Sequence, residues 1–251
     1  MRLIAVFIVF YGFVFIGQAQ ETTLYTNINE QFYLLQENSF TKVNNDNRRL
    51  SGFESNGFDV FTSADVSNSH YLAIFSFTSQ KIWLLDNELA TLDEIRLTSK
   101  FDKRISRFFM MNQSLYLYSE EGREWYIYDI FTNQVIFQKE LNSNIEEVVS
   151  FMGCHGKVYF QSARSIWFSD EYSDWEKVSL TASKEKESNC EVANCAFILE
   201  VDMVPVIADI NCGSYVPIGD FYRNKSITLF GDDLFYLDEQ EIHSVKVKLV
   251  K

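Results

Sequence analysis

The feature that most constrains this chain is a weak internal repeat of about 40 residues. Three runs of aromatic and aliphatic residues end in an aspartate: Ile82–Asp86, Trp125–Asp129 and Ile166–Asp170. The three aspartates lie 43 and 41 positions apart. Each run is the third of four short apolar segments that turn-forming residues separate. Four strands in every 40 to 45 residues, roughly, are typical of one β-propeller blade.

The repeat predicts an all-β fold, a β-propeller of about five blades, with six possible. Three units have four strands each, at 58–62, 71–77, 81–86 and 92–97; at 105–111, 114–118, 125–130 and 134–139; and at 147–152, 157–161, 165–168 and 175–180. Further strands are expected at 196–201, 206–210 and 215–218, and at 227–230, 234–238 and 242–248. Two strands at 32–35 and 40–43 form an N-terminal hairpin that belongs to none of these units.

The leftover segments at the two ends of the chain suggest how the ring closes. We expect the region 24–43 and the region 227–248 to complete one blade together, because a propeller removes its exposed edges in this way. The alternative is a sandwich of two sheets, which has similar short strands without a fixed period. No segment keeps an apolar stripe of helical period for three turns, which argues against a helical fold.

The first 19 residues have the layout of a secretory signal peptide. One basic residue, Arg2, precedes an apolar run from Leu3 to Ile16, and the small-residue exit Gly17-Gln18-Ala19 follows. The run is shorter than the roughly 18 residues needed to span a bilayer. We therefore expect cleavage after Ala19, one propeller domain over 20–251, no membrane span in the mature chain, and a secreted or periplasmic protein.

The negative net charge of the chain disfavours anionic partners. The formal net charge is −13, and removal of residues 1–19 with Arg2 makes it −14. A chain this acidic repels phosphate backbones, and no basic run is longer than a pair such as Arg48-Arg49. Nucleic-acid binding and docking on anionic lipid are both disfavoured.

Two segments resemble a known group of proteins. The stretch Tyr71–Leu97, with Lys81-Ile-Trp-Leu-Leu-Asp-Asn-Glu-Leu89 at its centre, and the hairpin Gln31–Phe40 are similar to blades of uncharacterised secreted propeller-like proteins from bacteria. The resemblance covers about a quarter of the chain and includes neither the WD nor the kelch signature. It implies a fold and export, and it implies no activity.

Four cysteines lie in the C-terminal half of a chain expected to be exported. In an up-and-down blade, Cys190, Cys195 and Cys212 would share one end of the fourth unit, and Cys154 would lie at the opposite end. A strand length of about 17 to 20 Å exceeds the reach of a disulfide. We expect Cys212 to pair with Cys190 or Cys195, with a Cys190–Cys195 bond as the rival, and Cys154 to stay unpaired.

No catalytic or metal-binding motif occurs in the sequence. There is no Gly-x-Ser-x-Gly elbow and no Cys-x-x-Cys pair, and the three histidines fall in three different units. We expect no cofactor and no metal site. The remaining enzyme hypothesis is a glycosidase-like hydrolase with carboxylates in the central funnel, for which the candidates are Asp59, Asp65, Glu200 and Asp202.

The favoured hypothesis is an exported, non-catalytic binding or scaffold protein. Its partner would be an extracellular or envelope protein or a glycan. Aromatic residues in blade loops could contact that partner, and the candidates are Tyr172, Trp175 and Tyr222. The alternative role for Trp175 is packing between blades.

Overall fold

The computed structural model describes most of the chain from residue 22 to residue 246. The described residues are 22–27, 29, 31–55, 57, 59–68, 70–154, 156–162, 165–178, 181–182, 196–201, 204–209, 214–217, 226–230, 233–238 and 241–246. The expected signal peptide, Cys190, Cys195, Cys212, Asp202 and Tyr222 lie outside these ranges.

The described elements are 23 strands in six sheets and one short 3-10 helix, η1 (Leu97–Ser99). Sheet 1 holds β1 (Thr23–Thr26), β2 (Phe32–Gln36), β3 (Ser39–Val43) and β4 (Arg49–Glu54). Sheet 2 holds β5 (Ser63–Asp65), β6 (Leu72–Ser76), β7 (Lys81–Leu85) and β8 (Thr91–Arg96). Sheet 3 holds β9 (Arg107–Met111), β10 (Ser114–Ser119), β11 (Glu124–Asp129) and β12 (Gln134–Glu140).

The remaining strands continue the same series. Sheet 4 holds β13 (Ser150–Cys154), β14 (Lys157–Gln161), β15 (Ile166–Ser169) and β16 (Glu176–Val178). Sheet 5 holds β17 (Thr181–Ala182), β18 (Ala196–Val201), β19 (Val204–Asp209) and β20 (Ser214–Pro217). Sheet 6 holds β21 (Ile227–Phe230), β22 (Asp233–Asp238) and β23 (Glu241–Lys246).

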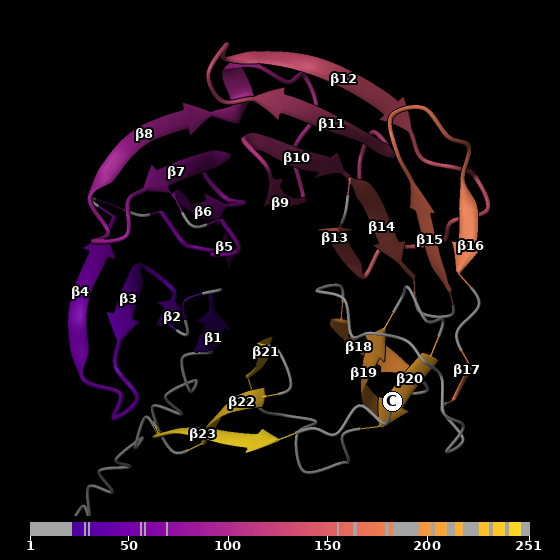
Figure 1. Cartoon of the computed structure of the whole chain (residues 1–251). Coiled ribbons are helices and arrows are strands. Elements are labelled where there is room, and N and C mark those ends of the chain that lie inside the picture. The colour runs from indigo at the N-terminus through magenta and orange to yellow at the C-terminus, as the bar shows by residue number, and fades with distance from the viewer. Residues whose placement is uncertain are drawn as a thin grey trace, which may run out of the picture.

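The six sheets stand around a common centre (Figure 1). Sheets 1 to 4 are antiparallel meanders in chain order, with the first strand nearest the centre and the fourth at the circumference. In such a meander the turns after the first and third strands lie at one rim of the ring. We call it the pocket rim, because the cavity described below opens there. The turn after the second strand and the connection to the next sheet lie at the other rim.

The predicted count of about five blades differs slightly from the structure. Four sheets are complete four-stranded meanders, and the last two depart from this plan. In sheet 5 the short β17 pairs in parallel with β20, and sheet 6 has three described strands. In sheet 2 the expected first strand 58–62 lies before the observed β5, and the strands β4 and β17 were not predicted.

The ends of the chain close the ring, but they do not share a sheet as the sequence led us to expect. β1 completes sheet 1, and β21–β23 form a sheet of their own. β1 lies beside β21 (Figure 1), and the Leu24 amide donates to Ser226 Oγ at 2.6 Å. The rings of Phe32 and Phe235 meet edge to face, with centroids 4.9 Å apart. Closure therefore comes from packing between two sheets.

The aspartates of the repeat cap the turns between the third and fourth strands. Asp86 Oδ1 accepts hydrogen bonds from the amides of Glu88 and Ala90, at 2.9 and 2.8 Å. Asp129 and Asp170 accept equivalent pairs of amide hydrogen bonds through Oδ1. Asn44 does the same in sheet 1, for the amides of Asp46 and Arg48. The repeated residue is thus a turn former, as short polar side chains commonly are.

Aromatic and aliphatic side chains fill the spaces between neighbouring sheets. Phe75 of sheet 2 meets Phe108 of sheet 3, and Phe109 of sheet 3 meets Phe151 of sheet 4. Gly153 is required at the second contact, because a Cβ there would lie 2.2 Å from the Phe109 ring. Strands buried on both faces explain why the sequence shows apolar clusters instead of a strict alternation.

A half-buried carboxylate connects sheets 2 and 3. Asp65 accepts hydrogen bonds from the Met110 amide through Oδ2, at 2.6 Å, and from the Ser67 amide through Oδ1, at 2.8 Å. Burial raises the pKa of Asp65, and these hydrogen bonds oppose the rise. The two oxygens have different donors, unlike the turn aspartates, where one oxygen accepts both hydrogen bonds.

Substitution Asp65→Asn tests this connection. The amide group of asparagine would turn a donor toward one of the two backbone N–H groups, so the amide of Ser67 or of Met110 loses its acceptor. We expect the free energy of unfolding to fall by about 1 kcal/mol, measured by urea denaturation. Asp86→Asn is the control, because its single accepting oxygen is retained. Equal midpoints for the two variants would contradict this account.

Candidate functional site

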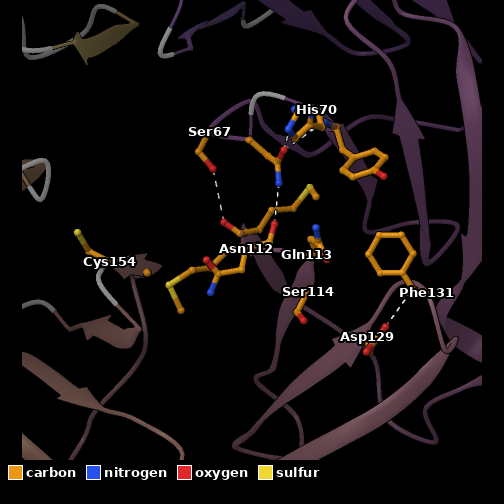
Figure 2. Close-up of a pocket in the computed structure, with 13 residues that line it drawn as sticks. Ser67, His70, Asn112, Gln113, Ser114, Asp129, Phe131 and Cys154 are labelled. Carbon is orange, nitrogen blue, oxygen red and sulfur yellow. Dashed lines mark hydrogen bonds between the residues drawn. The ribbon is translucent and has the colours of Figure 1, made fainter.

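A cavity of about 660 Å³ opens at the pocket rim, where sheets 2, 3 and 4 meet (Figure 2). Its walls come from the β5–β6 connection, the β9–β10 turn, the start of the β11–β12 turn and the end of β13. The lining residues are Ser67, Asn68, His70, Tyr71, Met110, Met111, Asn112, Gln113, Ser114, Asp129, Phe131, Gly153 and Cys154. Three consecutive units of the repeat therefore build one concave site.

Hydrogen bonds fix the wall between sheets 2 and 3. Asn68 Nδ2 donates to the Asn112 carbonyl at 2.7 Å, and Ser67 Oγ donates to the Met110 carbonyl at 3.4 Å. Asn112 has a φ of 58°, the left-handed conformation that asparagine adopts readily in a two-residue hairpin turn. This turn carries Gln113, which Figure 2 shows between the Phe131 side and the Cys154 side of the cavity.

The Asp129 turn forms one side of the cavity. Asp129 Oδ1 accepts from the amides of Phe131 and Thr132, at 2.8 and 2.9 Å. These bonds hold Phe131 at the cavity mouth with 62% of its surface exposed. Phe131 therefore places an apolar aromatic face beside the cavity, where a bound molecule could contact it. Among the described residues, no lysine or arginine lines the cavity, and Asp129 is the one carboxylate in its lining.

The structure separates the aromatic candidates that the sequence suggested. Tyr172 lies in the β15–β16 connection at the pocket rim and is 94% exposed. Trp175 is half-buried against the core between sheets 3 and 4, with its ring 5.1 Å from that of Phe160. Tyr222 lies outside the described residues. Neither described aromatic lines the cavity.

The expectation for Cys154 was wrong. Cys154 is disulfide-bonded, and it lines the cavity at the end of β13. The chain has three other cysteines, Cys190, Cys195 and Cys212, and the expected pairing among these three falls outside the described residues.

The order of sheet 5 explains why the earlier argument failed. It assumed that the fourth unit begins like the others, with its inner strand directly after the preceding sheet. Instead β17 comes first and pairs in parallel with β20, while β19 is antiparallel to both β18 and β20. β17 and β18 therefore run in the same direction, so the fourth unit does not follow the up-and-down order that the sequence argument used. The number of strands alone does not assign Cys190 to one rim.

The candidate glycosidase carboxylates do not form a site in the described part of the chain. Asp59 pairs with Lys81 at 3.3 Å, in the connection between β4 and β5. Asp65 is engaged by Ser67 and Met110 at the other end of β5. Glu200 lies on β18, and Asp202 is outside the described residues. The two carboxylates whose contacts are described each bind a partner and lie at opposite ends of one strand.

The described residues contain neither a candidate metal cluster nor a candidate membrane-spanning helix. Among the described residues, no group of three or more histidine, cysteine, aspartate or glutamate side chains could hold a metal ion. No helix in the described ranges is long and apolar enough to cross a bilayer.

Comparisons with known proteins bear on the fold. The WD40 repeats of RRP9 match with a TM-score of 0.58 at 10% identity, over 92% of this chain and 77% of that one. U3-55K matches with a TM-score of 0.58 at 10% identity, over 92% and 78%. A chain of the mitotic checkpoint complex matches with a TM-score of 0.54 at 13% identity, over 88% and 74%.

The chain is a β-propeller. No family model and no curated protein matches its sequence. At this identity the structural likeness establishes the fold alone, since one fold serves many functions.

Sequence reasoning missed the residues that build the cavity. Asn68, Gln113 and Phe131 lie in separate turns, and no motif joins them. One signal in the sequence could have indicated that Phe131 is exposed. It comes two residues after a turn aspartate, where an apolar side chain has no neighbouring strand to cover it.

Peptide mapping tests the disulfide assignment. After alkylation of the denatured, unreduced protein and digestion, we expect the Cys154 peptide to be linked to a peptide that carries Cys190, Cys195 or Cys212. The link should disappear when the digest is reduced. Recovery of Cys154 as an alkylated free thiol would contradict the structure.

Proposed function

We propose that this protein is an exported, non-catalytic binding scaffold that holds an extracellular or envelope protein at the pocket rim. The observation that carries the proposal is the cavity, built from turns of three sheets and bordered by the exposed ring of Phe131. Rigid turns on a closed ring of sheets hold such a surface in place without the cost of ordering it on binding.

The contacts of the cavity residues support a binding role. The backbone of the wall is fixed by Asn68 and Ser67, while no hydrogen bond holds the side chains of Asn112 and Gln113 among the described residues. These amides can donate to and accept from a partner's main chain. The lining combines these polar side chains with the apolar surfaces of Tyr71, Met110, Met111 and Phe131. Export rests on the N-terminal segment, and the protein recovered outside the cytoplasm should begin at Gln20.

The experiment compares the mature protein with two variants as bait in the native source. The pocket variant carries Phe131→Ser and Gln113→Ala. The control carries Leu92→Ser, which removes an apolar side chain that is 52% exposed on β8 and does not line the cavity. All three substituted side chains are on the surface, so we expect the unfolding midpoints of both variants to stay close to that of the parent.

The expected result is that a partner retained by the parent and by the Leu92→Ser control is lost, or retained at least about tenfold less, by the pocket variant. Quantitative mass spectrometry of the retained proteins measures this. Equal retention by all three baits would show that the cavity is not the binding site.

A further inference from the structure

The cavity has a charge and a wall composition that favour one kind of occupant. Its described lining contains one carboxylate, Asp129, and no lysine or arginine. Both amide hydrogen bonds to Asp129 end on Oδ1, so Oδ2 is available to a ligand. The chain as a whole carries a formal charge of −13, which attracts cations over a longer range.

The apolar part of the wall suits the stem of a long basic side chain. Tyr71 and Met111 are half-buried in the wall, and the exposed ring of Phe131 stands next to Asp129 (Figure 2). Lysine and arginine lay their aliphatic stems along apolar surfaces and bring the charged group to a carboxylate or an aromatic face. The neighbouring amide of Gln113 can bind the main chain beside such a residue.

We infer that the cavity binds a lysine or arginine side chain presented by an extended polypeptide segment of the partner. This inference rests on the proposed function and adds to it the chemical class of the bound group. Asp129 would accept hydrogen bonds from the basic group through Oδ2, and Phe131 would cover its stem.

The repeat supplies a clean variant for the test. In sheet 1 the same turn is capped by Asn44, whose Oδ1 accepts both amide hydrogen bonds. Asp129→Asn can therefore keep the turn and remove only the charge. Asp86→Asn makes the same change at the equivalent, half-buried position of sheet 2, which does not line the cavity. The two variants have the same net charge.

The probe is a library of random heptapeptides displayed on phage and selected on the immobilised mature protein. Enriched peptides are then synthesised with a fluorescein label, and their affinities for the parent and the variants are measured by fluorescence anisotropy. We expect enrichment of lysine or arginine next to apolar residues. Asp129→Asn should weaken binding by about tenfold or more, and Asp86→Asn should change it less than about twofold.

Other outcomes overturn the inference in distinguishable ways. Equal weakening by Asp129→Asn and Asp86→Asn would show a general charge effect and overturn the inference. Enriched peptides without basic residues, but with binding that Phe131→Ser abolishes, would overturn the inference and leave the proposed function standing. A library without any enriched peptide that depends on Phe131, or binding of glycans alone on an array, would overturn both.

Discussion

The structure depends on the packing of sheets whose two faces are both apolar. A single sheet such as β9–β12 buries Phe108 on one side and Phe109 on the other, against sheets 2 and 4 respectively. Such a sheet cannot be stable with water on either face, because burial of apolar surface is the main favourable term in folding. Each sheet needs two neighbours, and a ring is the arrangement that gives every sheet two neighbours.

Within the ring, polar contacts set the position of one sheet against the next. Gln80, in the turn after β6, donates to the Ile105 carbonyl and accepts from the Ile105 amide in the connection to sheet 3. Arg123, at the matching position 43 residues later, donates to the Ile145 carbonyl at 2.5 Å in the next connection. The same solution recurs with different side chains, which explains why the sequence repeat is weak while the structural repeat is regular.

The sequence was sufficient for the repeated parts of the fold. The strands of sheet 3 were predicted within about two residues, because Trp125–Asp129 and its flanking turns follow the repeat closely. The outer strands carry a β-bulge whose extra residue is an exposed aliphatic side chain, Leu50, Leu92 or Ile136, and this second periodic signal was not recognised. Bulges of this kind interrupt pairing at open sheet edges.

The cavity could not be predicted, because its residues depend on how three turns meet in space. The prediction for Cys154 assumed that the fourth unit is an up-and-down blade, and the parallel pairing of β17 departs from that plan.

If every sheet needs two neighbours, closure between sheets 1 and 6 must stabilise the whole ring. Hydrogen exchange measured by mass spectrometry on a Phe235→Ala variant tests it most directly, because Phe235 packs against Phe32 across the closing contact. If the account is correct, the loss of this one ring will speed exchange in β2 of sheet 1 and in β6, β7, β10 and β11 as well as in β22. Faster exchange confined to β21–β23, with sheets 2 and 3 as protected as in the parent protein, would show that the sheets are stable without a closed ring.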